Sequence, residues 1–124
     1  MTRYYDELAT YERDGFEIIV DKTYEDTDPW DQLSECFDSK EQLYADIDSC
    51  KYDWFMLRVR VFVEGLELGS AYLGGCLYED AEEVLKDGTA EDLIDEAIRG
   101  AKLAVYPLMR KLQAINEELE REFV

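Results

Sequence analysis

The chain has 124 residues, the usual size of one domain, and its 47% hydrophobic and 13% aromatic residues suffice for a packed core. It carries 31 acidic against 13 basic residues and no histidine, for a net charge of −18. This charge excludes direct binding to nucleic acid or to anionic membranes, because both attract cationic protein surfaces. We therefore expect one folded domain over residues 1–124 rather than a disordered chain.

Residues 16–23 predict the first strand. Phe16, Ile18 and Val20 alternate there with Glu17 and Asp21, which is the period of a half-buried strand. The dipeptide Asp14-Gly15 in front of it is a turn signal.

Two helices are predicted before residue 50 from their N-terminal signals. Asp28 is a typical N-cap, and Pro29 suits the first helical position. Ser39 followed by Gln42 is a capping-box pattern, and the helix that it opens runs through Ile47. Capping side chains accept hydrogen bonds from amide groups that the helix leaves unpaired, so they mark where each helix begins.

The centre of the chain predicts a β-hairpin. Apolar residues alternate at a period of two over residues 54–63, Glu64-Gly65 is a two-residue turn, and residues 66–73 return as the partner strand. A lone hairpin is marginal in water, so a third strand and covering helices are expected. The register that the turn sets pairs Val63 with Leu66, Val61 with Leu68, and Leu57 with Tyr72.

The second face of this hairpin carries the two basic residues of a nearly neutral region. Arg58 and Arg60 lie on it, and Glu67 is expected to form a cross-strand ion pair with Arg60. The glycines between Gly69 and Gly75 lack the spacing of a phosphate-binding loop. They indicate a strand end that needs the conformational freedom of glycine.

The C-terminal third is predicted to be helical. A short helix from Asp80 to Lys86 ends at Gly88, and a longer helix begins with Thr89 as its cap. Pro107 lacks an amide proton and cannot complete the backbone hydrogen bond of its turn. A kink, or a break into two helices, is therefore expected at this position.

An apolar stripe follows the long helix at alternating steps of four and three residues, as in a coiled coil. Its members are Ile94, Ile98, Ala101, Val105, Leu108, Leu112, Ile115 and Leu119. Two interpretations stay open. The stripe either covers the sheet as part of the core or forms the seam of a homodimer, where Gly100 and Ala101 would permit close approach.

The sequence lacks the residues of most catalytic sites. Without histidine there is no Ser–His or Cys–His pair and no histidine-ligated metal. Cys36, Cys50 and Cys76 are odd in number and widely spaced, which indicates reduced, core-type cysteines. Neither Asp26-Thr27-Asp28 nor Asp46-Ile47-Asp48 continues as a calcium-binding loop. We expect no catalytic residue, metal or cofactor; an enzyme using carboxylates alone is the catalytic alternative.

Two acidic clusters provide the candidate partner-binding residues. They are Asp26, Asp28 and Asp31 in the first, and Glu91, Asp92, Asp95 and Glu96 in the second. Like charges four residues apart destabilise a helix, so the second cluster lowers the stability of its helix. A binding function would explain why these acids are present. Since duplex DNA carries one charge per about 1.7 Å, 18 charges equal about 31 Å of duplex. The expected partner is a basic protein surface, such as that of a nucleic-acid-handling enzyme.

In its length, its charge, its nine tyrosines and its lack of histidine, the whole chain resembles the small acidic anti-restriction and anti-CRISPR proteins of phages and mobile elements. The stretch from Asp53 to Cys76 is similar in style to uncharacterised phage-type proteins. The resemblance implies a non-enzymatic inhibitor that imitates DNA and occupies the nucleic-acid groove of a bacterial defence enzyme. DNA mimics are often more helical, and the hairpin departs from that pattern.

The expected fold is α+β, with an antiparallel sheet of about three strands, a central β-hairpin, helices on one face and a long C-terminal helical segment formed by a helix pair. Met1 to Glu7 lacks the apolar run of a signal peptide, and no stretch reaches the length of a membrane span. We therefore expect the cytoplasm of a bacterial host. The structural alternative to an inhibitor is an assembly protein that dimerises through the stripe.

Overall fold

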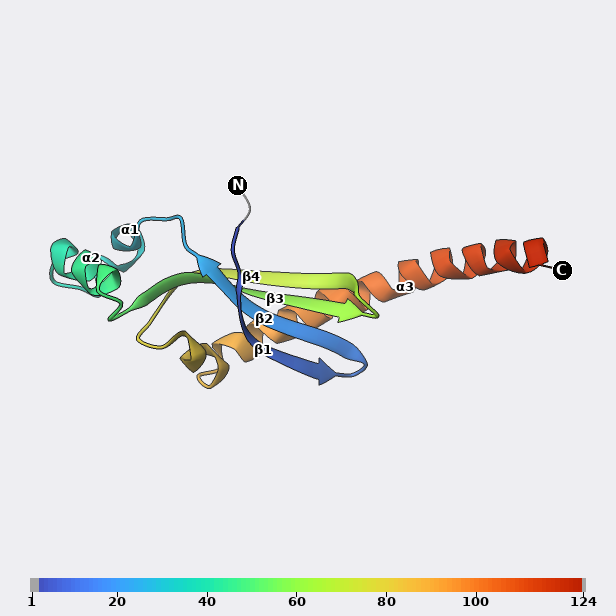
Figure 1. The fold of residues 1–124 in the computed structure, drawn as a ribbon, viewed down its shortest axis with the longest axis horizontal. Coiled ribbons are helices and arrows are strands. Elements are labelled where there is room, and N and C mark those ends of the chain that lie inside the picture. The colour runs from blue at the N-terminus through green and yellow to red at the C-terminus, as the bar shows by residue number, and fades with distance from the viewer. Residues whose placement is uncertain (1–2, 124) are drawn as a thin grey trace.

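The computed structural model describes residues 3–123 and shows the α+β fold expected from the sequence (Figure 1). Its strands are β1 (Asp6–Arg13), β2 (Phe16–Tyr24), β3 (Asp53–Val63) and β4 (Leu66–Tyr78). Its helices are α1 (Pro29–Leu33), α2 (Lys40–Asp48), the 3₁₀ helix η1 (Ala81–Leu85) and α3 (Thr89–Phe123). The four strands form one antiparallel sheet in the order β1-β2-β3-β4.

Two tight turns with the same backbone conformation set the sheet. Asp14 and Gly15 join β1 to β2 with φ angles of 55° and 85°, and Glu64 and Gly65 join β3 to β4 with 49° and 78°. Two successive residues with positive φ match the twist of antiparallel strands, which is why such turns favour glycine. Both turns were predicted from the sequence.

The expectation of about three strands omitted β1. Four of its eight residues are charged, and its exposed and half-buried positions do not alternate. A register shift between Glu7 and Ala9 interrupts its pairing with β2. An edge strand pairs on one side only and needs few apolar residues, so its sequence resembles a loop. The turn at Asp14-Gly15 was the available signal, because such a turn implies a strand on each side.

The predicted register of the central hairpin is wrong beyond its first pair. Val63 pairs with Leu66 as expected, but Val61 pairs with Gly69 and not with Leu68. The register shift accommodates one extra residue in β4, which is a β-bulge. Because side chains alternate between faces, the shift places Tyr72 opposite Arg58, on the face away from α3.

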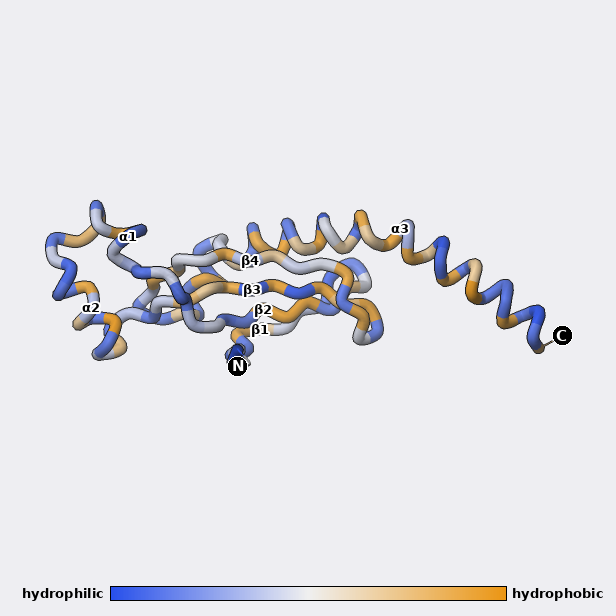
Figure 2. The backbone as a smooth tube through the Cα atoms, turned by 90° about the horizontal axis from the view of Figure 1, so that it is seen from above, coloured by the Kyte–Doolittle hydropathy of each residue, from blue (hydrophilic) through white to orange (hydrophobic). Residues whose placement is uncertain are grey.

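Helix α3 covers the other face of the sheet and encloses the core. It packs against β2, β3 and β4, as Figures 1 and 2 show. The buried side chains of the sheet include Phe55, Leu57, Val59, Val61, Ile18 and Val20, and those of α3 are Ala90, Leu93, Ile94, Ala97, Ile98 and Ala101. Burial of this apolar surface is the main favourable term in folding.

The C-terminal segment is one helix and not a helix pair. The helical assignment continues through Pro107, so the expected break into two helices is wrong. Figure 2 shows α3 changing direction beyond the end of the sheet, as expected for a kink near a proline. The apolar stripe is divided at this point, because its first members are buried and its last members, such as Leu112 and Leu119, are exposed. No helix in the described part of the chain is both long and apolar enough to span a membrane.

Helices α1 and α2 lie beyond one end of the sheet (Figure 1), which corrects the expectation that all helices would cover one face. Their predicted caps are confirmed. The Asp28 carboxylate accepts a hydrogen bond from the Trp30 amide, and the Ser39 hydroxyl accepts one from the Gln42 amide. At α3 the expected cap is wrong. The Asp92 amide donates to the Gly88 carbonyl at 3.0 Å, and the Thr89 amide itself donates to the Asp87 carboxylate at 2.9 Å.

The face of the sheet opposite α3 contains a buried ionic cluster. Asp21 is 3% exposed and accepts two hydrogen bonds from Arg58, at 2.7 and 2.6 Å, and one from Arg60 at 3.3 Å. The Arg58 guanidinium stacks on the ring of Tyr5, with its Cζ atom 3.4 Å from the ring centroid. The expected ion pair between Arg60 and Glu67 is therefore wrong among the described residues, and Asp21 is the partner instead.

A methyl group at Gly69 is expected to separate α3 from β4. A Cβ atom there would lie 2.4 Å from the carbonyl oxygen of Ala97 and 2.8 Å from the amide nitrogen of Ala101. Gly69→Ala should lower the free energy of unfolding by about 2 kcal/mol, measured by urea denaturation. The control Gly100→Ala meets no atom within 4 Å and should raise it by about 1 kcal/mol, because alanine favours helices. Equal effects of the two substitutions would contradict this packing.

Asp21→Asn should destabilise the protein, because it leaves two guanidinium groups close together on a partly buried surface. We expect the free energy of unfolding to fall by about 2 kcal/mol, measured by urea denaturation. Glu17→Gln on the same face is the control, since the exposed Glu17 carboxylate has no ion pair within residues 3–123. A loss of similar size in both variants would refute a specific role for the cluster.

Candidate functional site

Nine carboxylates between residues 79 and 96 are exposed. They are Glu79, Asp80, Glu82, Glu83, Asp87, Glu91, Asp92, Asp95 and Glu96, and we call them the acidic strip. In the same segment Ala81, Val84, Leu93 and Ile94 are buried, so the apolar residues face the core and the acids face outward. Helix η1 packs against α3, which joins both parts of the strip.

Four acids of the strip have structural partners. The Asp80 carboxylate accepts from the Glu82 amide at 3.0 Å and caps η1. Asp87 accepts from the Tyr78 hydroxyl at 2.6 Å, and this bond together with the Thr89 amide lowers the pKa of Asp87. Arg13 donates to Glu91 at 2.6 Å, with Asp95 3.8 Å away. These contacts hold the strip in place.

Five carboxylates of the strip accept no side-chain or backbone hydrogen bond and form no ion pair in the described part of the chain. They are Glu79, Glu82, Glu83, Asp92 and Glu96. Each is exposed and fully available to a partner. Since Asp92 and Glu96 are four residues apart on α3, their mutual repulsion is not relieved within the monomer.

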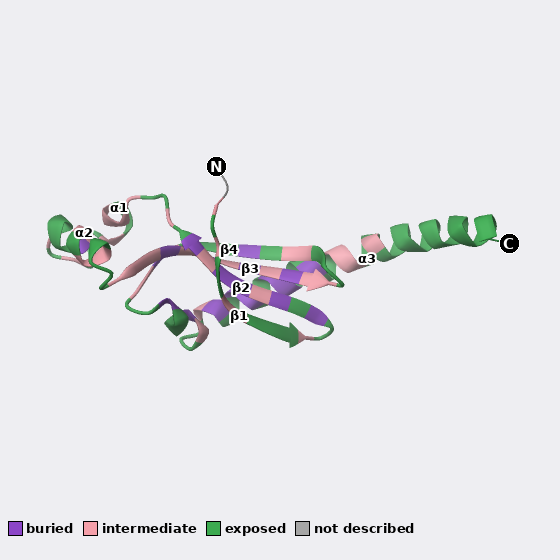
Figure 3. Ribbon diagram, viewed as in Figure 1, coloured by how far each residue is buried: buried purple, intermediate pink, exposed green. Residues whose placement is uncertain are grey.

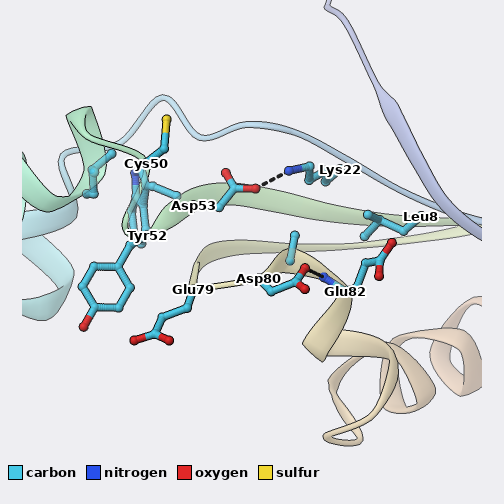
Figure 4. A pocket seen from close by; sticks show the side chains of 11 residues that line it. Leu8, Lys22, Cys50, Tyr52, Asp53, Glu79, Asp80 and Glu82 are labelled. Carbon is cyan, nitrogen blue, oxygen red and sulfur yellow. Dashed lines mark hydrogen bonds and ion pairs between the residues drawn. The ribbon is translucent and has the colours of Figure 1, made fainter.

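An open pocket of about 800 Å³ adjoins the strip at η1 (Figure 4). It lies between the C-terminal end of α2, the start of β3 and the segment that leads into η1. Its lining residues are Leu8, Lys22, Ile47, Cys50, Tyr52, Asp53, Trp54, Glu79, Asp80, Ala81 and Glu82. The strip therefore contributes three carboxylates to the pocket.

The pocket combines carboxylates with aromatic rings. Asp53 forms an ion pair with Lys22 across it, and Asp80 turns back to the η1 backbone (Figure 4). Trp54 is fixed by a hydrogen bond from its indole nitrogen to the Thr27 carbonyl, at 3.0 Å. Carboxylates beside aromatic faces are a favourable environment for the cationic side chains of arginine and lysine.

The structure does not bring the first predicted cluster next to the acidic strip. Figures 1 and 2 both show α1 well separated from the first turns of α3. Asp26 forms an ion pair with Arg3. Asp28 caps α1 and accepts a hydrogen bond from the Tyr44 hydroxyl, which lowers the pKa of Asp28 and raises that of Tyr44 to about 12. Asp26 and Asp31 are exposed, and Asp28 is half-buried.

The sequence predicted only part of this site. Glu91, Asp92, Asp95 and Glu96 belong to the strip, but the acids of residues 79–83 were not included among the candidates. Their signal was the density of acidic residues, since residues 79–96 hold nine acids and one base. The pocket could not be predicted, because the tertiary fold brings β2, β3 and η1 together.

No group of three or more metal-ligating side chains occurs within residues 3–123. All three cysteines are free. The expectation of core-type cysteines holds for Cys76, where burial raises the pKa of the thiol to about 11. It is wrong for Cys36 and Cys50, which are exposed.

Comparison with known proteins finds no relatives for the chain: no protein-family model, no curated protein and no solved structure matches it. The resemblance to anti-restriction and anti-CRISPR proteins in size and charge thus stays a prediction. The function has to be argued from the geometry and charge of the chain itself.

Salt should stabilise this protein, because the net charge of −18 opposes compaction and ions screen that repulsion. Raising NaCl from about 0.01 M to about 0.3 M should increase stability by about 1 kcal/mol, or Tm by about 4 °C, measured by calorimetry. The variant Glu82→Lys/Asp92→Lys replaces two acids by two bases and should show a smaller increase. An equal or larger increase in the variant would contradict repulsion within the strip.

Proposed function

We propose that this protein is a non-enzymatic acidic inhibitor or binding protein. Its partner is a protein with a cationic surface, of the kind that binds nucleic acid, and its mode of action is competition for that surface. Such a partner fits a bacterial defence enzyme, the target of the anti-restriction and anti-CRISPR proteins that the chain resembles in size and charge.

The observation that carries this proposal is the confinement of the net charge to one part of the molecule. Residues 1–101, which contain the sheet, the short helices and the buried half of α3, hold 27 acids and 9 bases and thus the whole charge of −18. Residues 102–124 are neutral, with four acids and four bases. Within this part, residues 79–96 hold nine acids and one base, a net charge of −8.

The acidic strip is suited to the role of a phosphate backbone. Its carboxylates lie on or next to η1 and α3, and five of them have no partner within residues 3–123, so that they attract a basic groove without first breaking an ion pair there. Long-range attraction between a strongly acidic and a basic surface accelerates association by orders of magnitude. The adjoining pocket would receive one arginine or lysine side chain between Tyr52, Trp54 and the carboxylates.

The proposal is tested by capture from bacterial lysate on the immobilised full chain, with washes at about 0.1 M and 0.5 M salt. We expect a nucleic-acid-binding protein that both duplex DNA and high salt release, because the contacts are electrostatic and exposed. A partner that resists high salt and ignores DNA would overturn the proposal.

Two variants of equal net charge make this test specific. Each substitution of an acid by lysine changes the charge by two, so Glu82→Lys/Asp92→Lys and Glu117→Lys/Glu120→Lys both have a net charge of −14. The first pair lies in the acidic strip and the second on the distal part of α3. The captured partner should bind the first variant more than tenfold more weakly and the second nearly normally. Equal weakening would indicate that only total charge matters.

A further inference from the structure

The distal half of α3, residues 102–123, extends beyond the sheet (Figure 3). Ala101 is the last residue of α3 that is fully buried. Further along the stripe Leu112, Ile115 and Leu119 are 53%, 54% and 44% exposed. A row of large apolar side chains on one side of an exposed helix indicates an interaction surface.

The spacing of this row is that of a two-helix coiled coil, in which apolar residues alternate at steps of three and four. One set of core positions is Val105, Leu112 and Leu119, and the other is Leu108 and Ile115; Ala101, the preceding member of the stripe, is buried against the sheet. Pro107 lies on the outer side of the helix in this pattern and does not interrupt the row. The distal half of α3 therefore presents a complete seam for one further helix.

The charges of the distal half are divided between its two ends. Residues 102–111 contain three bases and no acid, and residues 112–123 contain four acids and one base. The bases of the first part are Lys102, Arg110 and Lys111, and the acids of the second are Glu117, Glu118, Glu120 and Glu122. The two parts therefore have opposite net charges of equal size.

We propose that the distal half of α3 pairs with the same segment of a second copy in antiparallel orientation. This orientation places the basic part of each helix beside the acidic part of the other, whereas a parallel pair would oppose like charges. It also places residues 1–101 of the two copies, each with a net charge of −18, at opposite ends of the paired helices. The helices overlap over about 20 residues, or about 30 Å, and this distance exceeds the Debye length of about 8 Å at physiological ionic strength. A parallel pair would hold these two acidic parts side by side.

The charges also select one register. In the favoured one the core layers are Leu112 against Ile115 and Leu108 against Leu119 of the second copy, each formed twice by symmetry. Lys111 then flanks Glu118 of the second copy, again twice. A shift by one heptad would instead place Lys111 beside Lys111 of the second copy, and these two like charges would repel each other. The overlap in the favoured register would cover Leu112, Ile115 and Leu119, the exposed members of the stripe.

The molar mass of the full chain tests the association. Sedimentation equilibrium between about 1 and 200 µM should show the 14.5 kDa chain converting to twice that mass. Leu112→Asp should abolish the dimer, and the matched control Leu103→Asp should preserve it, because Leu103 is 76% exposed and lies off the seam. A monomer at all concentrations, or equal loss in both variants, would overturn the proposal.

The orientation is tested by exchanging charges. Lys111→Glu and Glu118→Lys should each weaken dimerisation about tenfold, and the double variant should restore most of the loss. These two residues are seven positions apart on one helix, about 10 Å, so they do not pair within a copy. Dimerisation without this recovery would overturn the antiparallel register. All these positions are exposed, so the variants should keep the circular dichroism spectrum of the folded chain.

Discussion

The structure depends on the burial of one face of the sheet beneath the first turns of α3. Ile94, Ala97, Ile98 and Ala101 are removed from solvent there, and Gly69 allows the helix backbone to approach β4 closely. Burial of apolar surface contributes about 25 cal/mol per Å² and is the term that must exceed the self-repulsion of a chain with a net charge of −18. The same core includes the buried residues of η1, so it fixes η1 next to α3 and thereby positions the acidic strip.

The chain presents two surfaces of different physical character. Residues 1–101 carry the entire net charge, while the distal half of α3 is neutral and presents an apolar row. Salt weakens electrostatic association and leaves apolar association largely intact, so the two surfaces are expected to respond differently to ionic strength. Antiparallel pairing through the distal helix would place two acidic bodies at the ends of one particle and give it two binding surfaces.

Features that arise from local chemistry were predictable from the sequence. The turns, the cap at Asp28 and the alternation in β3 depend on neighbours within a few residues, and the structure contains them. The polar edge strand β1 and the bulge that shifts Val61 to Gly69 depend on pairing across the sheet, so the alternation of apolar residues did not indicate them. Likewise the cluster at Glu91 was recognised as an acidic run, but its continuity with the pocket at Tyr52 arises from tertiary packing.

The most direct measurement is chemical labelling of carboxylates, read residue by residue by mass spectrometry, on the chain alone and bound to the partner that it captures. Recognition through the acidic strip predicts that Glu79, Glu82 and Asp92 lose reactivity in the complex, while Glu117 on the distal part of α3 keeps it. Unchanged labelling of the strip in a complex that forms nonetheless would contradict the proposed role of its charge.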